Sequence, residues 1–272
     1  MNNTANNFGG GIYSEFKLNG INNIITGNKA GIMGGGIYIP KYLNEPINCS
    51  MNCTIRNNKV NSYNDDYSSI PYSISLSTEL KEIYTNITTG TFFPLLFRVN
   101  DIFGNKLNDV TKYYSSMILK VILKNENFEN VNVNYKNSDF NSNYDLKGNI
   151  VSLINGQFDL KNFQIYADHG YYYLQLIIEN FKEIDLKFEF DDIKIYVSEC
   201  SKKQVKMYNN KNILYCENPI CHSNCPVDIS AECIPGDYTS KISTNDINKN
   251  ICMCYKGWTG TDCRNKIFID FK

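Results

Sequence analysis

Hydrophobic and polar residues alternate along much of the chain between about residue 73 and residue 197. The clearest hydrophobic sets, each on one face of a strand, are Leu119, Val121 and Leu123, and Tyr172, Leu174, Leu176 and Ile178. Strand-forming runs bounded by Asn, Asp or Gly are predicted at residues 92–99, 117–123, 149–154, 157–167, 171–178 and 186–197. With no credible amphipathic helix between them, these runs predict an antiparallel β-sandwich.

A different pattern precedes this stretch. The residues Gly-Gly-Gly-Ile-Tyr stand at 9–13 and again at 34–38, an offset of 25. The flanks at 3–5 and 28–30 agree at the same offset, and residues 58–60 resemble the opening of a third copy. Such a period, with short β-type runs and Gly or Asn at the corners, predicts coils of a parallel β-solenoid in which stacked Asn side chains hydrogen-bond. The alternative is a Gly-rich linker that repeats by accident.

The coils also predict that the chain belongs to a larger protein. Two coils and part of a third cannot bury a continuous core, so further coils are expected before Met1. The first eight residues contain neither the basic nor the apolar segment of a signal peptide. No apolar run reaches the roughly 18 residues that a membrane-spanning helix requires.

All ten cysteines fall into two groups. Cys49 and Cys53 form a pair that could close the last coil with a short disulfide. The second group comprises Cys200, Cys216, Cys221, Cys225, Cys233, Cys252, Cys254 and Cys263. An even number of cysteines in a segment poor in apolar residues predicts disulfides in place of a core, and therefore an oxidising compartment. Zinc at Cys221-His222-Ser223-Asn224-Cys225 is the weaker alternative.

The charge balance excludes some partners. A formal net charge of −1 favours neither nucleic acid nor a membrane surface.

Four sites satisfy the N-glycosylation sequon N-x-[ST]: Asn2, Asn48, Asn52 and Asn86. In a chain so rich in Asn, about as many arise by chance, and Asn86 is the best candidate because it precedes the first clear strand.

The candidate chemistry is sparse. Polysaccharide cleavage needs paired carboxylates, whereas residues 1–44 contain only Glu15. His169 has no nucleophile beside it and is expected to be a solvated loop residue. We therefore expect no catalytic residue, no cofactor and no metal. Tyr171 and Tyr173 point away from Tyr172 and could form a recognition patch, although an ordinary Tyr-rich sheet edge is the simpler interpretation.

Two motifs resemble known modules. Residues 252–263, with the order C-x-C-x-x-G-W-x-G-x-x-C, resemble the closing half of an EGF-like module. That resemblance implies a Cys254–Cys263 bridge, turns at Gly257 and Gly260, and Trp258 packed over the sulfurs. Residues 196–199 before Cys200 lack the acidic cluster of calcium-binding members. Residues 168–174 resemble the tyrosine corner of immunoglobulin domains, with a leucine in the place of the cysteine.

In order, these parts resemble large β-helix, Ig-like and EGF-like surface proteins of the anaerobic-fungus type, some of them similar to class C G-protein-coupled receptors. The expected fold is all-β: parallel β-helix coils at 1–60, an Ig-like sandwich at 65–198, a cysteine-rich EGF-like module at 199–264 and a tail at 265–272. The resemblance implies a non-enzymatic extracellular recognition, adhesion or spacer segment with a protein or carbohydrate ligand, and membrane contact only through segments outside this chain. The alternative is an accessory part of a pectate-lyase-like enzyme.

Overall fold

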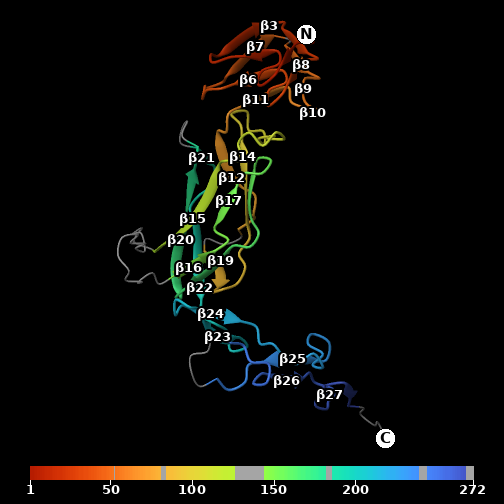
Figure 1. Ribbon diagram of the computed structural model, residues 1–272, viewed down its shortest axis with the longest axis vertical. Coiled ribbons are helices and arrows are strands. Elements are labelled where there is room, and N and C mark those ends of the chain that lie inside the picture. Colours follow the sequence, from red (N-terminus) through yellow and green to blue (C-terminus); the bar gives the residue numbers. More distant parts are fainter. Residues whose placement is uncertain (52, 81–83, 126–143, 182–185, 239–243, 268–272) are drawn as a thin grey trace.

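The computed structural model describes residues 1–272 except 52, 81–83, 126–143, 182–185, 239–243 and 268–272. The described part is all-β and contains no helix. It is elongated: an N-terminal region of short stacked strands, a central sandwich and a C-terminal cysteine-rich region follow one another along the long axis (Figure 1). No helix in this part is long and apolar enough to cross a membrane.

The N-terminal region winds into stacked turns of chain with parallel pairing. Its parallel ladders are β1 (Thr4–Ala5), β5 (Lys29–Ala30) and β9 (Lys59–Val60); β2 (Ile12–Tyr13), β6 (Ile37–Ile39) and β11 (Tyr67–Ser69); β3 (Leu18–Ile21) with β7 (Ile47–Met51); and β4 (Ile24–Thr26) with β8 (Thr54–Arg56). Tyr13 pairs with Tyr38, which is the predicted offset of 25, whereas Lys29 pairs with Lys59 at an offset of 30. The antiparallel strand β10 (Tyr63–Asn64) ends the first ladder.

The repeated glycines are required where successive turns approach each other. Gly9 and Gly34, at equivalent places, have φ values of 65° and 68°, in the left-handed region that glycine adopts most easily. A Cβ atom on Gly10 would overlap the carbonyl oxygens of Lys29 and Gly35, and one on Gly35 would overlap the backbone of Lys59. Only glycine fits between the stacked turns at these places.

Buried asparagines join the turns to one another. The Asn3 amide donates to Asn28 Oδ1 at 2.9 Å, and both the backbone amide and Nδ2 of Asn28 donate to Asn58 Oδ1, at 3.0 and 2.9 Å. Asn58 is fully buried and donates in turn to Asp66 Oδ1. This ladder is the stacking of Asn side chains that the repeat predicts.

The central region consists of two sheets facing each other. One has the order β18 (Gln157–Leu160), β14 (Leu95–Asn100), β12 (Ser73–Leu76) and β21 (Lys187–Phe188). The other has the order β13 (Thr85–Thr88), β22 (Ile193–Ser198), β20 (Gly170–Glu179), β15 (Ile118–Asn125) and β17 (Ile150–Ser152). Both predicted hydrophobic sets line the shared core. Most pairings are antiparallel, but β12 with β21 and β13 with β22 are parallel.

Three predicted strands were wrong in extent. The run 157–167 is divided into β18 and β19 (Gln164–Ala167) by a turn at 161–162, and β19 pairs with β16 (Tyr144–Lys147). The run 186–197 is divided into β21 and β22, which belong to different sheets. The run 92–99 begins as a strand only after Pro94, which has no amide hydrogen to donate. In each case polar or proline residues inside the run break the ladder.

The described part of the C-terminal region contains three antiparallel strand pairs. They are β23 (Val205–Tyr208) with β24 (Leu214–Glu217), β25 (Ala231–Ile234) with β26 (Ile251–Cys254), and β27 (Trp258–Thr259) with β28 (Asn265–Lys266). The predicted tail therefore begins as the second strand of a hairpin. Residues 268–272 lie outside the described part.

Candidate ligand-binding groove

The described cysteines of the C-terminal region are all paired. The bridges are Cys200–Cys216, Cys221–Cys233, Cys225–Cys252 and Cys254–Cys263. The last is the pair that the EGF-like resemblance implies. Because Cys221 and Cys225 are both in disulfides, no thiolate stands beside His222 for zinc. Cys53 is also disulfide-bonded, whereas the side chain of Cys49, its predicted partner, lies outside the described part.

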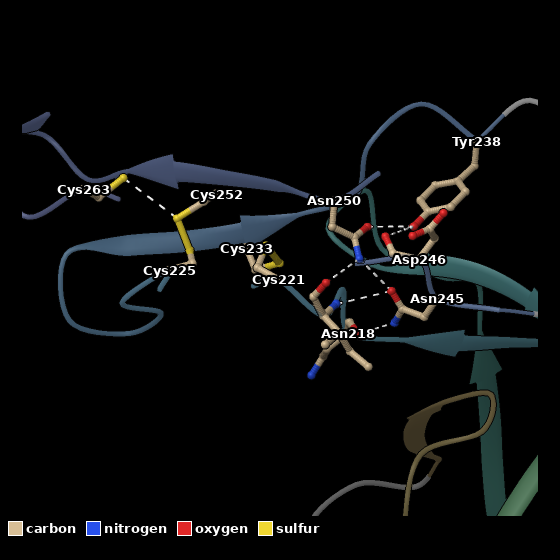
Figure 2. The surroundings of a disulfide bond; sticks show 11 residues. Asn218, Cys221, Cys225, Cys233, Tyr238, Asn245, Asp246, Asn250, Cys252 and Cys263 are labelled. Atoms are coloured by element: carbon tan, nitrogen blue, oxygen red, sulfur yellow. Dashed lines mark hydrogen bonds between the residues drawn. A yellow bond between two sulfur atoms is a disulfide. The ribbon is translucent and has the colours of Figure 1, made fainter. Parts of the chain in front are cut away.

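Sulfur atoms form the small core of this region. Cys263 and Ala231 are fully buried, and the sulfurs of Cys252 and Cys263, from two different bridges, lie 4.0 Å apart (Figure 2). Gly257 and Gly260 have φ values of 92° and 96°, the left-handed conformation expected of turn glycines. The expectation for Trp258 was wrong: its ring lies in the β27–β28 hairpin, 5.2 Å from Lys266 Nζ, and does not belong to the cysteine cluster.

An amide network holds the long loop between Cys233 and Cys252. Asn250 Nδ2 donates to Asn245 Oδ1 at 2.7 Å and to the Ile220 carbonyl at 2.9 Å, and Tyr238 donates to Asn250 Oδ1 at 2.8 Å (Figure 2). Asn245 reaches the Asn218 carbonyl at 2.7 Å. These bonds tie residues 245–250 of the loop to the segment before Cys221.

An aromatic-lined hollow lies where the stacked turns meet the sandwich. It is an open groove of about 630 Å³ whose walls come from both regions. The first region contributes Phe8, Tyr13, Glu15, Tyr38, Pro40, Lys41, Tyr42 and Ile70, and the sandwich contributes Tyr113 and Tyr114. We call this hollow the aromatic groove. Aromatic rings dominate its walls, and two of them, Tyr13 and Tyr113, are 52% and 53% exposed.

The rings of the aromatic groove support one another. Phe8 stacks on Tyr38 with centroids 4.5 Å apart and meets the edge of Tyr113 at 5.1 Å. The hydroxyls of Tyr38 and Tyr114 are both buried and share a hydrogen bond of 3.1 Å. The groove therefore has a fixed floor, and Tyr13 and Tyr113 are the half-exposed rings of its lining.

The charged side chains that line the aromatic groove form a single ion pair. Lys41 Nζ lies 2.6 Å from Glu15 Oε2, and both side chains are about half exposed. At that exposure the pair adds little to folding stability. It does hold a donor and an acceptor at a fixed place beside the rings. Glu15 is the only carboxylate that lines the groove, so the paired carboxylates of a glycosidase are not present there.

Tyr171 and Tyr173 lie on the outer face of the five-stranded sheet, as predicted, and they do not stand alone. Tyr171 packs against Tyr84 at 4.9 Å and Tyr196 at 4.8 Å, and the Tyr84 and Tyr173 hydroxyls lie 3.4 Å apart. We call Tyr84, Tyr171, Tyr173 and Tyr196 the tyrosine patch. Its second half, Tyr84 and Tyr196, was missed because the pairing of β13 and β22 is not visible in the sequence.

The residues of the motif at 168–174 are joined by a hydrogen bond within the turn. The Tyr172 hydroxyl donates to the Asp168 carbonyl at 3.0 Å, and its ring packs against the sandwich core. Burial raises the Tyr172 pKa, with a smaller contribution from the Asp168 charge. His169, in the same turn, is mostly exposed and lies 3.9 Å from Glu199.

The four sequons differ in setting. Asn2, Asn48 and Asn86 are exposed, whereas Asn52 lies outside the described part. Asn48 is in β7 opposite Asn19, and Asn86 is in β13 opposite Tyr196. Only the second of these strand pairs contains an aromatic residue.

Three carboxylates, Asp65, Asp66 and Asp101, line a smaller pocket of about 240 Å³. They are already engaged: Asp101 accepts from the amides of Phe103 and Asn105, and Asp65 from the amide of Gly34. Burial, opposed by these hydrogen bonds, raises the pKa of Asp101 to about 6. Across the described residues, no group of three or more His, Cys, Asp or Glu has an arrangement that could hold a metal ion.

The chain matches no family model, and no curated protein or solved structure is significantly similar to it. The residues and the fold are therefore what define its class. The described part is all-β and contains four disulfides. Because disulfides persist in oxidising compartments, they fit an extracellular or secreted protein.

Proposed function

We propose that the chain is a non-enzymatic extracellular segment that acts as a stiff spacer and binds carbohydrate in the aromatic groove. In this proposal a short parallel β-helix, an Ig-like sandwich and an EGF-like module follow one another. The observation that carries it is the aromatic groove itself, since its two walls belong to different regions of one continuous structure.

The assignment of each region rests on its own geometry. Parallel ladders with a repeat near 25 residues support the β-helix. The Tyr172–Asp168 hydrogen bond between facing sheets supports an Ig-like sandwich. From Cys221 onwards, the first cysteine pairs with the third, the second with the fourth and the fifth with the sixth, an order typical of EGF-like modules.

Carbohydrate suits the aromatic groove better than a peptide does. Peptide grooves offer pockets for alternate side chains, whereas this groove presents the half-exposed tyrosines Tyr13 and Tyr113 beside one ion pair. Sugar rings have C–H faces that pack on tyrosine, and their hydroxyls can both donate to Glu15 and accept from Lys41.

Binding to immobilised polysaccharides tests the proposal. Tyr13→Ala and Tyr113→Ala should each weaken binding about fivefold, because each removes a stacked ring worth roughly 1 kcal/mol. Tyr63→Ala is the matched control, since Tyr63 is 55% exposed in β10 but does not line the groove. Equal binding by all three variants, or no polysaccharide bound, would count against the groove.

The same mixtures address the alternative, an accessory part of a carbohydrate-active β-helix enzyme. Both proposals predict carbohydrate binding, but only a chain with catalytic parts shortens the polymer. Shortening of a bound polysaccharide, measured by size-exclusion chromatography, would overturn the non-enzymatic assignment. Because Glu15 is paired with Lys41 and has no second carboxylate in the groove, we expect unchanged polymer length.

A further inference from the structure

Asn86 and the tyrosine patch occupy one continuous surface. In β13, β22 and β20 the register places Asn86 beside Tyr196 and Tyr196 beside Tyr171. Side chains directly opposite each other in adjacent strands share a face. Asn86 therefore stands in line with two tyrosine rings on the outer face of the five-stranded sheet.

The residues next to Asn86 along the chain lie on the same side. Positions two apart in an extended segment point to the same face, so Tyr84 and Thr88 flank Asn86 there. The Tyr84 ring packs on Tyr171, with Lys194 Nζ 5.9 Å from its centroid. The acceptor asparagine and the sequon threonine thus share the face of the tyrosine patch.

The accessibility fits a modification. Asn86 is exposed in β13, and Tyr171 is 46% exposed. Among the described strands, β13 pairs only with β22 and is the last strand on its side of the sheet. An unprotected edge strand can pair with another chain, and proteins commonly cover such edges.

We propose that Asn86 carries an N-linked glycan whose first N-acetylglucosamine packs on the tyrosine patch and covers the edge strand β13. This inference rests on the proposed extracellular setting. The transfer needs a lipid-linked oligosaccharide pyrophosphate as donor. Asn86 Nδ2 bonds to C1 of the sugar and loses one proton, while the bond from C1 to the pyrophosphate oxygen breaks and the lipid pyrophosphate leaves.

The contrast with Asn48 sharpens the inference. Asn48 is also exposed in a strand, but neither β7 nor its partner β3 contains an aromatic residue. A glycan there would have no ring in register to pack on. Comparing loss of the glycan at Asn86 with loss of the glycan at Asn48 therefore separates the effect of a glycan from the effect of its contact with tyrosine.

The test uses the full chain, secreted behind an added signal sequence from cells that make only high-mannose glycans. Mass spectrometry measures occupancy at Asn86. Endoglycosidase H then trims the glycan to its first sugar. We expect the intact and trimmed forms to have the same melting temperature, about 2–4 °C above that of Asn86→Gln. Asn48→Gln should leave the melting temperature unchanged.

Removal of the ring tests the contact itself. When both forms also carry Tyr84→Leu, the melting temperature of the trimmed form should no longer exceed that of Asn86→Gln. When both carry Tyr84→Phe, the difference in melting temperature should remain. If Tyr84→Leu is not secreted, the N-acetyl methyl resonance of the trimmed form decides, because a stacked ring shifts it upfield. An N-acetyl methyl resonance without the upfield shift would overturn the inference. A trimmed form with the same melting temperature as Asn86→Gln would overturn it as well.

The outcomes also separate this inference from the proposed function. A secreted, fully disulfide-bonded chain with an unoccupied Asn86 contradicts the glycan alone. A chain that is retained in the cell, with free thiols at the cysteines paired here, contradicts the extracellular setting and with it both proposals.

Discussion

Asp101 is an acidic side chain with almost no contact with water. It is 2% exposed, and its Oδ1 accepts hydrogen bonds from the amides of Phe103 and Asn105 at 3.0 and 2.8 Å. Those bonds favour the carboxylate, but desolvation dominates and places the pKa at about 6, with Asp65 adding a like charge. The turn after β14 is therefore held by an acid that is costly to ionise.

This has a consequence for stability against pH. The folded pKa lies above the usual 3.8, so between about pH 4 and pH 6 the folded chain binds more protons at this site than the unfolded chain. The free energy of unfolding should fall as pH rises through that window. Asp101→Asn keeps an Oδ1 acceptor and removes the titration. Between pH 4 and pH 7 the free energy of unfolding of Asp101→Asn should rise by about 2 kcal/mol relative to that of the wild type.

Urea unfolding at several pH values measures this difference. Asp191→Asn is the control, because Asp191 is an exposed carboxylate in the segment between β21 and β22. A difference between Asp101→Asn and the wild type that stays constant from pH 4 to pH 7 would show that Asp101 does not titrate in this range.

At the scale of elements, the glycines explain why the N-terminal turns can stack. The hydrophobic alternation predicts the strands of the sandwich, because one face of each is buried in a common core. The strands of the turns are two to five residues long, too short for alternation to reveal. Their signal is the repeat of glycine and asparagine, whose places are fixed by backbone contact between turns.

Gly35→Ala tests this account. Its Cβ would overlap the Lys59 backbone, which cannot move without shifting β9. We expect a loss of about 3 kcal/mol or more in the free energy of unfolding, within the range of severe core substitutions. Gly104→Ala is the matched control: Gly104 has a φ of 78° but no atom within 4 Å of the added carbon. It should cost about 1–2 kcal/mol, from backbone strain alone.

Urea unfolding of both variants gives the comparison. If Gly35→Ala lost no more stability than Gly104→Ala, close packing of the turns would not be the reason for the second glycine of the repeat.

The candidate site was only partly predictable from sequence. The Tyr171 and Tyr173 pair and the cysteine cluster follow from local patterns. The aromatic groove does not, because Tyr38 and Tyr114 meet across 76 residues of chain. Strand order also decides the tyrosine patch: the parallel pairing of β13 with β22 joins Asn86 to Tyr196 across 110 residues. Local periodicity carries no information about such pairings.

At the scale of the whole molecule, the boundary between the stacked turns and the sandwich is a packed interface. Met33 and Tyr38 belong to the same buried cluster as the sandwich core, and Tyr38 bonds to Tyr114. Further along, the Ile102 amide donates to Ser69 Oγ at 2.9 Å. A similar join lies at the other end, where the Cys216 amide donates to the Thr89 carbonyl at 3.0 Å. Regions joined in this way cannot rotate freely about a linker.

The two larger regions should therefore unfold together. Tyr114→Ala removes a buried ring of the sandwich and the hydrogen bond to Tyr38, at a cost of about 3 kcal/mol. If the interface couples the regions, amides of β6, on the other side of it, should exchange faster with deuterium in this variant, and thermal unfolding of the two regions should remain a single transition.

Hydrogen exchange followed by mass spectrometry separates coupling from local damage. Tyr63→Ala, an exposed position in β10, should leave β6 protected. Faster exchange confined to the sandwich, with β6 unchanged in Tyr114→Ala, would mean that the turns fold on their own and that the aromatic groove lies at a hinge. Because Tyr38 and Tyr114 form the floor of that groove, coupled exchange would also mean that any ligand bound there stabilises both regions at once.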